Sequence, residues 1–84
     1  MTPDEIKTLI EAGLDTDTVD IRSDDNTHFA ALVVSQKFSG LRPIQRHQLV
    51  YAPLGSKMGN EIHALSIQAC TPEEWAASPL ARGQ

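Results

Sequence analysis

Residues 28–35 form the segment that most limits how this chain can fold. Six apolar residues, Phe29 to Val34, stand between His28 and Ser35. A strand that is apolar on both faces is most simply the central strand of its sheet, or a strand covered on both sides. The chain has 84 residues, enough for one small domain. We therefore expect the rest of the chain to be built around this strand.

Helix-start signals occur at both ends of the chain. Thr2-Pro3-Asp4-Glu5 and Thr71-Pro72-Glu73-Glu74 each place a threonine cap before a proline, with a glutamate three residues after the cap. The first predicts a helix over 3–13 and the second a short helix that holds Trp75. A third helix is predicted from about Arg42-Pro43 to Pro53. Its apolar face would contain Ile44, His47, Val50, Tyr51 and Leu54, while Arg42, Gln45, Arg46 and Gln48 would point outward.

The remaining segments predict two further strands. Residues 16–23 alternate between polar and apolar side chains, and the polar turn at 23–27 joins them to the apolar strand as a hairpin. Residues 62–69 alternate in the same way. The predicted fold is α+β, a two-layer sandwich in the order α-β-β-α-(turn)-β-α with a three-stranded mixed sheet. We expect a single domain over 1–77 and a flexible C-terminal tail over 78–84.

Charge is unevenly distributed along the chain. Residues 1–25 hold eight acidic and two basic residues, a balance of −6, whereas residues 26–60 hold no acidic residue and four basic ones. This basic segment predicts a surface for an acidic partner or for nucleic acid, with Arg42, Arg46 and Lys57 as the contact residues. The absence of a long apolar run or of a secretory signal predicts a soluble cytoplasmic protein with no membrane contact.

Three histidines and one cysteine are the candidate metal ligands. His28, His47 and His63 have no HxH or HxxxH spacing, and Cys70 is alone, so the sequence contains no local metal motif. His63 fits either a ligand or a strand-end residue bonded to backbone. For Cys70 and His47 a packing role is the simpler interpretation. No nucleophile–base motif is present, which argues against an enzyme.

Two phrases of the sequence resemble the BolA family. They are EIHALSIQACTPEEW over 61–75, and Phe38-Ser39-Gly40 followed by Gln45-Arg46-His47. The resemblance implies a class II KH-like fold and makes His63 the ligand of a [2Fe–2S] cluster shared with a monothiol glutaredoxin and glutathione. It also implies an isolated chain without a cluster, a monomer or weak homodimer. A histidine ligand would raise the cluster potential and make the bridge sensitive to acid.

The loop between the first two strands departs from the family pattern. There the family carries a second ligand, a cysteine or histidine a few residues before the strand-two aromatic, but Asp25 stands four residues before Phe29. His28 is the nearest imidazole, and Asp24 and Asp25 are the other candidates. A polar residue that merely closes the hairpin is the structural alternative. This short acidic loop looks most like the small, acid-induced bacterial branch of the family.

Nucleic-acid binding is the alternative function. KH-like folds bind single strands through a GxxG loop, but Gly55 and Gly59 are separated by three residues. Some BolA proteins are regarded as transcriptional regulators, so the segment 42–60 remains the predicted DNA-binding region.

Overall fold

The computed structural model describes residues 2–59, 62 and 64–77 and has the predicted order of elements. Two short 3-10 turns, at Gln36–Phe38 and Gly55–Lys57, flank the second helix. The regular elements are α1 (Pro3–Gly13), β1 (Thr18–Arg22), β2 (His28–Val34), α2 (Pro43–Leu54), β3 (Ala64–Cys70) and α3 (Pro72–Ala77). The α+β prediction is therefore confirmed.

The three strands form one mixed sheet in the order β1-β2-β3. β1 and β2 pair antiparallel as the predicted hairpin, with Ile21 opposite Ala31. β2 and β3 pair parallel, with His28 opposite Ala64 and Val34 opposite Cys70. The apolar strand is thus central, as its sequence predicts, and α2 forms the crossover that a parallel pair requires.

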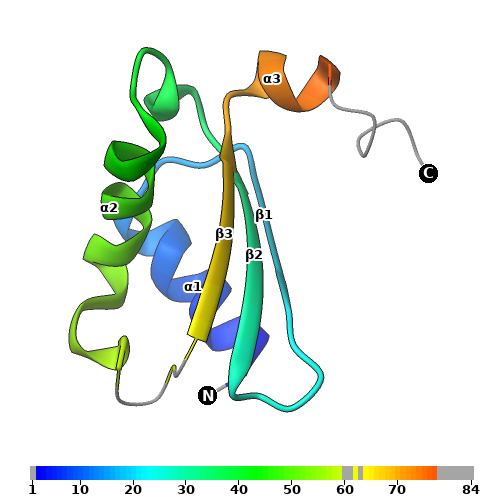
Figure 1. The fold of residues 1–84 in the computed structure, drawn as a ribbon, viewed down its shortest axis with the longest axis vertical. Helices are drawn as coiled ribbons and strands as arrows, with labels where there is room; N and C mark the ends of the chain where they lie inside the picture. Colours follow the sequence, from blue (N-terminus) through cyan, green and yellow to red (C-terminus); the bar gives the residue numbers. More distant parts are fainter. Residues whose placement is uncertain (1, 60–61, 63, 78–84) are drawn as a thin grey trace.

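One face of the sheet packs against the helices and the other is open. Helices α1 and α2 lie on the same side of the sheet (Figure 1). On β2, Phe29, Ala31 and Val33 are buried toward these helices, whereas Ala30 on the opposite face is exposed. The core consists mainly of apolar residues from α1, the sheet, Phe38 and α2: Ile6, Ile10, Val19, Ile21, Phe29, Ala31, Val33, Phe38, Val50, Leu54 and Ile62.

Both terminal helices begin with the predicted capping box. In α1, Glu5 N–H donates to Thr2 Oγ1 (3.3 Å) and Thr2 N–H donates to Glu5 Oε1 (2.8 Å). In α3, Glu74 N–H donates to Thr71 Oγ1 (3.2 Å) and Thr71 N–H donates to Glu74 Oε1 (2.9 Å). Each box satisfies amide groups that have no partner within the helix.

Helix α2 is less deeply buried than its sequence predicts. Val50 and Leu54 are buried, but Ile44 is 68% and Tyr51 38% exposed, so the expectation that both lie on the packed face is wrong. The reason is that the side of α2 that bears Pro53 packs against α1. A Cβ on Gly13 would lie 2.7 Å from Pro53 Cβ, so the two helices approach closely at this point. This contact turns the side of α2 that bears Ile44 and Tyr51 toward solvent.

Some of the sequence-based predictions concern features that the described residues do not show. The predicted tail, 78–84, is outside the described residues, and the KH-like label remains a prediction. Among the described residues, no helix has the length and apolar character needed to cross a membrane.

Candidate functional site

The β1–β2 hairpin is closed by side chains that hold its loop in one shape. Ser23 Oγ donates to His28 O (2.7 Å) and accepts from Asn26 N–H (2.9 Å). Asp25 Oδ1 accepts from the amides of Thr27 and His28, each at 2.9 Å. Asn26 adopts a left-handed conformation (φ 56°), which asparagine tolerates. The start of β2 is therefore fixed by hydrogen bonds within the loop.

The same aspartate orients the His28 ring. Asp25 Oδ2 lies 2.9 Å from His28 Nδ1, and the His28 side chain is 68% exposed. The amide and ring of His28, with the amide of Thr27, hold the pKa of the Asp25 carboxyl well below its usual range. A carboxylate can only accept, so Nδ1 carries the proton. In the neutral ring, the lone pair is then on Nε2, the atom left for a ligand.

Of the two histidines that the family resemblance suggests as ligands, His63 and His28, the structure describes His28. His63, the principal ligand predicted from sequence, lies outside the described residues. Ala64, which directly follows His63 in the sequence, pairs with His28 across the β2–β3 ladder. Among the described residues, no group of three or more His, Cys, Asp or Glu side chains could hold a metal ion.

The other candidate ligands differ in their exposure and in the hydrogen bonds that they already make. The Asp25 carboxylate already accepts hydrogen bonds at both oxygens, which makes it an orienting group for His28. Asp24 is exposed in the same loop. Cys70 pairs with Val34 at the far end of β3, and burial raises the pKa of its thiol. His47 is half-buried on α2, in keeping with a packing role.

Arg46 occupies a different position from the one its sequence predicts. Its side chain is only 13% exposed, so the expectation that it points outward is wrong. The guanidinium donates to Leu41 O (3.0 Å) and Ala69 O (3.1 Å) and lies 6.0 Å from the centre of the Phe38 ring. These contacts join the start of α2 to the end of β3.

Glu74 completes this cluster. Its carboxylate accepts from Arg46 Nη1 (2.6 Å) and Nη2 (3.2 Å), and together with the Thr71 amide these bonds lower the pKa of Glu74 to about 2. Glu74 thus caps α3 and anchors it to α2. Sequence reasoning assigned Glu74 to the cap alone, since nothing in the spacing of residues 46 and 74 signals that they meet.

The three predicted basic contacts do not form one patch. Arg42 is exposed at the start of α2 and Lys57 is half-buried beyond its end. The helix between them has 12 residues, about 18 Å at 1.5 Å per residue. With Arg46 paired to Glu74, the positive charge is divided between the two ends of α2.

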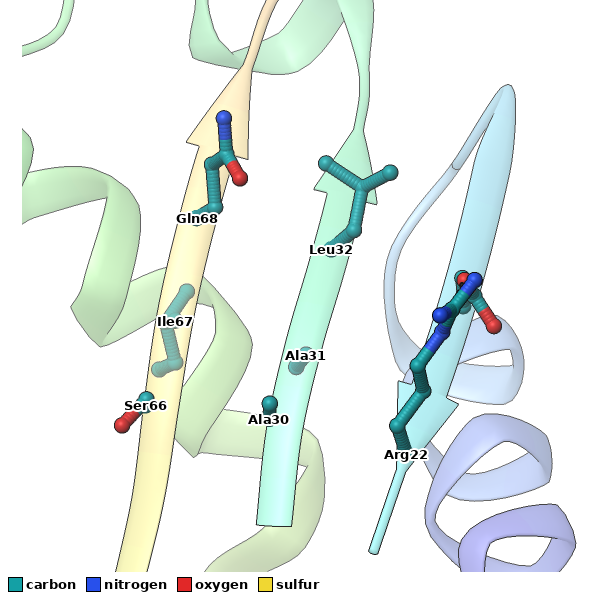
Figure 2. A pocket seen from close by; sticks show the side chains of 8 residues that line it. Arg22, Ala30, Ala31, Leu32, Ser66, Ile67 and Gln68 are labelled. Carbon is teal, nitrogen blue, oxygen red and sulfur yellow. Dashed lines mark hydrogen bonds and ion pairs between the residues drawn. The ribbon is translucent and has the colours of Figure 1, made fainter. Parts of the chain in front are cut away.

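The open face of the sheet bears a shallow depression of about 260 Å³. Figure 2 shows its side chains arising from all three strands, with Arg22 on β1, Ala30 and Leu32 on β2, and Ser66 and Gln68 on β3. Arg22 Nε donates to Asp20 Oδ2 at 3.1 Å. The lining has no aromatic side chain on which a base could stack, and no nucleophile–base pair.

The chain matches one family over most of its length. A family model described as BolA-like protein covers residues 8–74. The solution structure of BolA1 from Mus musculus has a TM-score of 0.82 at 34% identity, over 92% of this chain and 70% of that one.

Curated relatives carry names of more than one kind. Human BolA-like protein 1 is 40% identical in an alignment 79 residues long, which covers 83% of this chain and 58% of that protein. The DNA-binding transcriptional regulator BolA of Vibrio cholerae is 38% identical over 73 residues, 87% of this chain and 65% of that protein. The acid stress protein IbaG of Escherichia coli K12 is 38% identical over 77 residues, 90% of each chain.

These relatives differ in length. The chain spans 58% to 62% of the human and bovine proteins, whereas its match to the acid stress protein runs almost from end to end in both.

Proposed function

This chain belongs to the BolA family, and from that premise we propose that it is an iron–sulfur adaptor and not an enzyme. It pairs in the cytoplasm with a monothiol glutaredoxin and shares with it a glutathione-bearing [2Fe–2S] cluster. The cluster is cargo for delivery, or the signal in an iron or stress response. Alone, the chain holds no cluster, because one or two imidazoles do not complete the coordination of an iron pair.

The observation that carries the proposal is the oriented ring of His28. Asp25 fixes its Nδ1 side at 2.9 Å, so Nε2 is presented from an exposed side chain. A carboxylate behind a ligating imidazole is the usual outer-shell arrangement of histidine–metal sites. His28 also pairs with Ala64, whose sequence neighbour is His63.

We therefore assign His63 as the first ligand from this chain and His28 as the second. Imidazole is a suitable ligand for iron, and two imidazoles on one iron raise the cluster potential relative to thiolates. Asp25 takes the role of orienting group at the loop position where the family carries a ligand. Protonation of either ring would release the cluster, so the shared complex should be less stable in mild acid.

Reconstitution with glutaredoxin, glutathione, iron and sulfide tests this proposal. The mixture should give a heterodimer whose visible absorption differs from that of the glutaredoxin homodimer. His63→Ala should abolish the new spectrum and His28→Ala should weaken it, while His47→Ala, a histidine outside the hairpin, serves as the matched control. An unchanged spectrum and cluster half-life in His63→Ala would refute the ligand assignment.

Nucleic-acid binding is the second candidate, favoured by the name of the Vibrio cholerae relative and by the acid-free segment 26–60. A net charge of −4 and the pairing of Arg46 with Glu74 oppose it. The salt dependence of DNA binding, compared between the wild type and an Arg42→Ala/Lys57→Ala variant, tests it. Absence of binding at about 150 mM salt would exclude a direct activity.

A further inference from the structure

The side chain of His28 lies on the open face of the sheet. Phe29 is buried toward the helices, whereas Ala30 is exposed on the opposite face. Because side chains alternate along a strand, His28 is on the same face as Ala30. His28 lines a depression of about 410 Å³, whose other lining residues include Arg22, Asp24 and Ser66. The candidate ligand is thus at the rim of a depression large enough for a small molecule.

Short side chains separate the charged groups of this depression. Ala30 pairs with Arg22 on one side and with Ser66 on the other, so the three residues lie side by side across the sheet. Figure 2 shows the small side chains of Ala30 and Ser66 on the strands next to Arg22. The same three residues also line the depression of about 260 Å³ described above, so the two depressions are continuous.

Polar groups around the depression keep hydrogen-bonding capacity. The Arg22 side chain is 82% exposed, and its bond to Asp20 uses Nε alone, which leaves both terminal nitrogens as donors. Within the described part of the chain, the Asp24 carboxylate and the Ser66 hydroxyl make no hydrogen bond or ion pair. The depression therefore presents a cation, an anion and a hydroxyl beside the His28 ring.

This set of groups is complementary to a ligand that carries a carboxylate and an ammonium group close together. A guanidinium donates paired N–H groups to a carboxylate, and a carboxylate accepts from an ammonium. Glutathione carries both groups on one carbon atom, at its γ-glutamyl end. In the function proposed above, glutathione is bonded through its sulfur to the cluster that His28 binds.

The spacing within the sheet agrees with a ligand of this size. Arg22 is opposite Ala30, which follows His28 by two residues, about 7 Å along the strand. An extended tripeptide spans about 10 Å. Because the sulfur is fixed on the cluster, contacts made by the rest of the peptide are intramolecular and gain from a high effective concentration.

We propose that this depression binds the γ-glutamyl end of the glutathione that accompanies the cluster. Arg22 binds the α-carboxylate and Asp24 binds the α-ammonium, while the peptide lies over Ala30 and Ser66. Arg22 and Asp24 are positioning residues, and the histidines remain the metal ligands. The assignment rests on the proposed function, because the glutathione arrives with the cluster.

A titration without iron tests the site by itself. The probe is S-methylglutathione, whose blocked sulfur binds no metal, added to the ¹⁵N-labelled chain. The amides of Arg22, Asp24, Ala30 and Ser66 should show saturable shifts at millimolar concentrations. An analogue in which hydrogen replaces the α-amino group should bind about two- to fivefold more weakly. Absence of saturable shifts up to about 50 mM would overturn the proposal, and so would equally tight binding of free glutamate, which would indicate a site for amino acids.

Charge-removing variants test the two contacts. Arg22→Gln should weaken binding of S-methylglutathione, whereas Arg42→Gln, a change at an exposed arginine on α2, should not. Asp24→Asn should remove the preference for S-methylglutathione over the analogue without the amino group, and Asp17→Asn, at another exposed aspartate, should retain it. Circular dichroism should be unchanged in all four. Equal affinities in Arg22→Gln and Arg42→Gln would overturn the assignment.

The reconstituted heterodimer separates this proposal from the one on which it rests. Arg22→Gln should retain the visible spectrum, because both histidines are present, and should shorten the half-life of the cluster about two- to fivefold. A half-life unchanged by Arg22→Gln would overturn the glutathione site and leave the histidine ligands standing. A mixture in which the wild type forms no heterodimer would overturn the proposed function and this site together.

Discussion

Two side-chain pairs lie at opposite ends of the sheet, and they differ in which of their polar atoms remain available. Arg46 and Glu74 join where β3 ends, with an Arg46 side chain only 13% exposed and further bonds to Leu41 O and Ala69 O. Asp25 and His28 join where β2 begins, with a His28 side chain 68% exposed. The first pair ties three elements together, whereas the second fixes one side of a ring and leaves Nε2 to solvent. The polar atoms of Arg46 are used in contacts within the protein, which indicates a structural role. The His28 ring is oriented through Nδ1 while Nε2 remains available to bind a metal ion, which makes it a candidate ligand.

Removing the arginine should have the largest effect on stability. Arg46→Ala leaves two backbone carbonyls and the Glu74 carboxylate without their partner and removes the packing on Phe38. We expect a loss of about 2 kcal/mol in the free energy of unfolding. Urea unfolding measures it, with the exposed Arg42→Ala as the control, expected to change stability by less than about 0.5 kcal/mol. Equal losses in the two variants would remove the structural distinction between the pairs.

Acid should weaken the same cluster through Glu74. Its folded pKa of about 2 is below the ordinary value of 4.5, so its pairing stabilises the fold fully above pH 4.5 and is lost as the pH falls toward 2. Glu74→Gln should therefore lose less stability than the wild type between pH 5 and 2.5. Glu73→Gln, whose carboxylate only accepts from Gln36, is the comparison. Parallel pH profiles for Glu74→Gln and the wild type would contradict this assignment.

Replacing Asp25 in the β1–β2 hairpin should change the tautomer of the His28 ring more than the stability of the fold. In the wild type, long-range nitrogen–proton NMR correlations should show the His28 proton on Nδ1. Asp25→Ala removes the acceptor and should shift the proton toward Nε2, the tautomer that blocks a ligand. The spectrum of His47 should not change. A His28 tautomer that is unaffected by Asp25→Ala would show that the carboxylate does not orient the ring.

His28→Ala should have the smallest effect on the fold. The ring is exposed, so we expect a change in unfolding free energy within about 0.5 kcal/mol. The same variant should shorten the lifetime of the cluster shared with glutaredoxin. A fold destabilised as strongly as in Arg46→Ala would make His28 a structural residue.

The order of elements could be predicted from the sequence because each signal is local. Capping boxes at Thr2 and Thr71, the apolar strand 28–35 and the turn at 23–27 depend on neighbouring residues, and the structure confirms them. Which side of α2 packs against α1 depends on the contact between Gly13 and Pro53, which are forty residues apart in the sequence. The exposure of Ile44 and Tyr51 was therefore mispredicted.

The site was predictable in its residue types but not in its pairings. His28 and Asp25 are three residues apart, yet which of the two is the ligand and which the orienting group depends on the shape of the loop. Arg46 and Glu74 are 28 residues apart, so their bidentate contact could not be inferred from spacing. Family resemblance supplied the role of His63, which remains a prediction.

Pulsed electron paramagnetic resonance of the reduced cluster tests the central claim most directly. The heterodimer would be assembled from unlabelled glutaredoxin and this chain labelled with ¹⁵N-histidine. We predict strong ¹⁵N couplings from two imidazoles in the wild type and in His47→Ala, and from one imidazole in the weakened cluster that His28→Ala retains. A reduced cluster without ¹⁵N-histidine coupling would contradict the account.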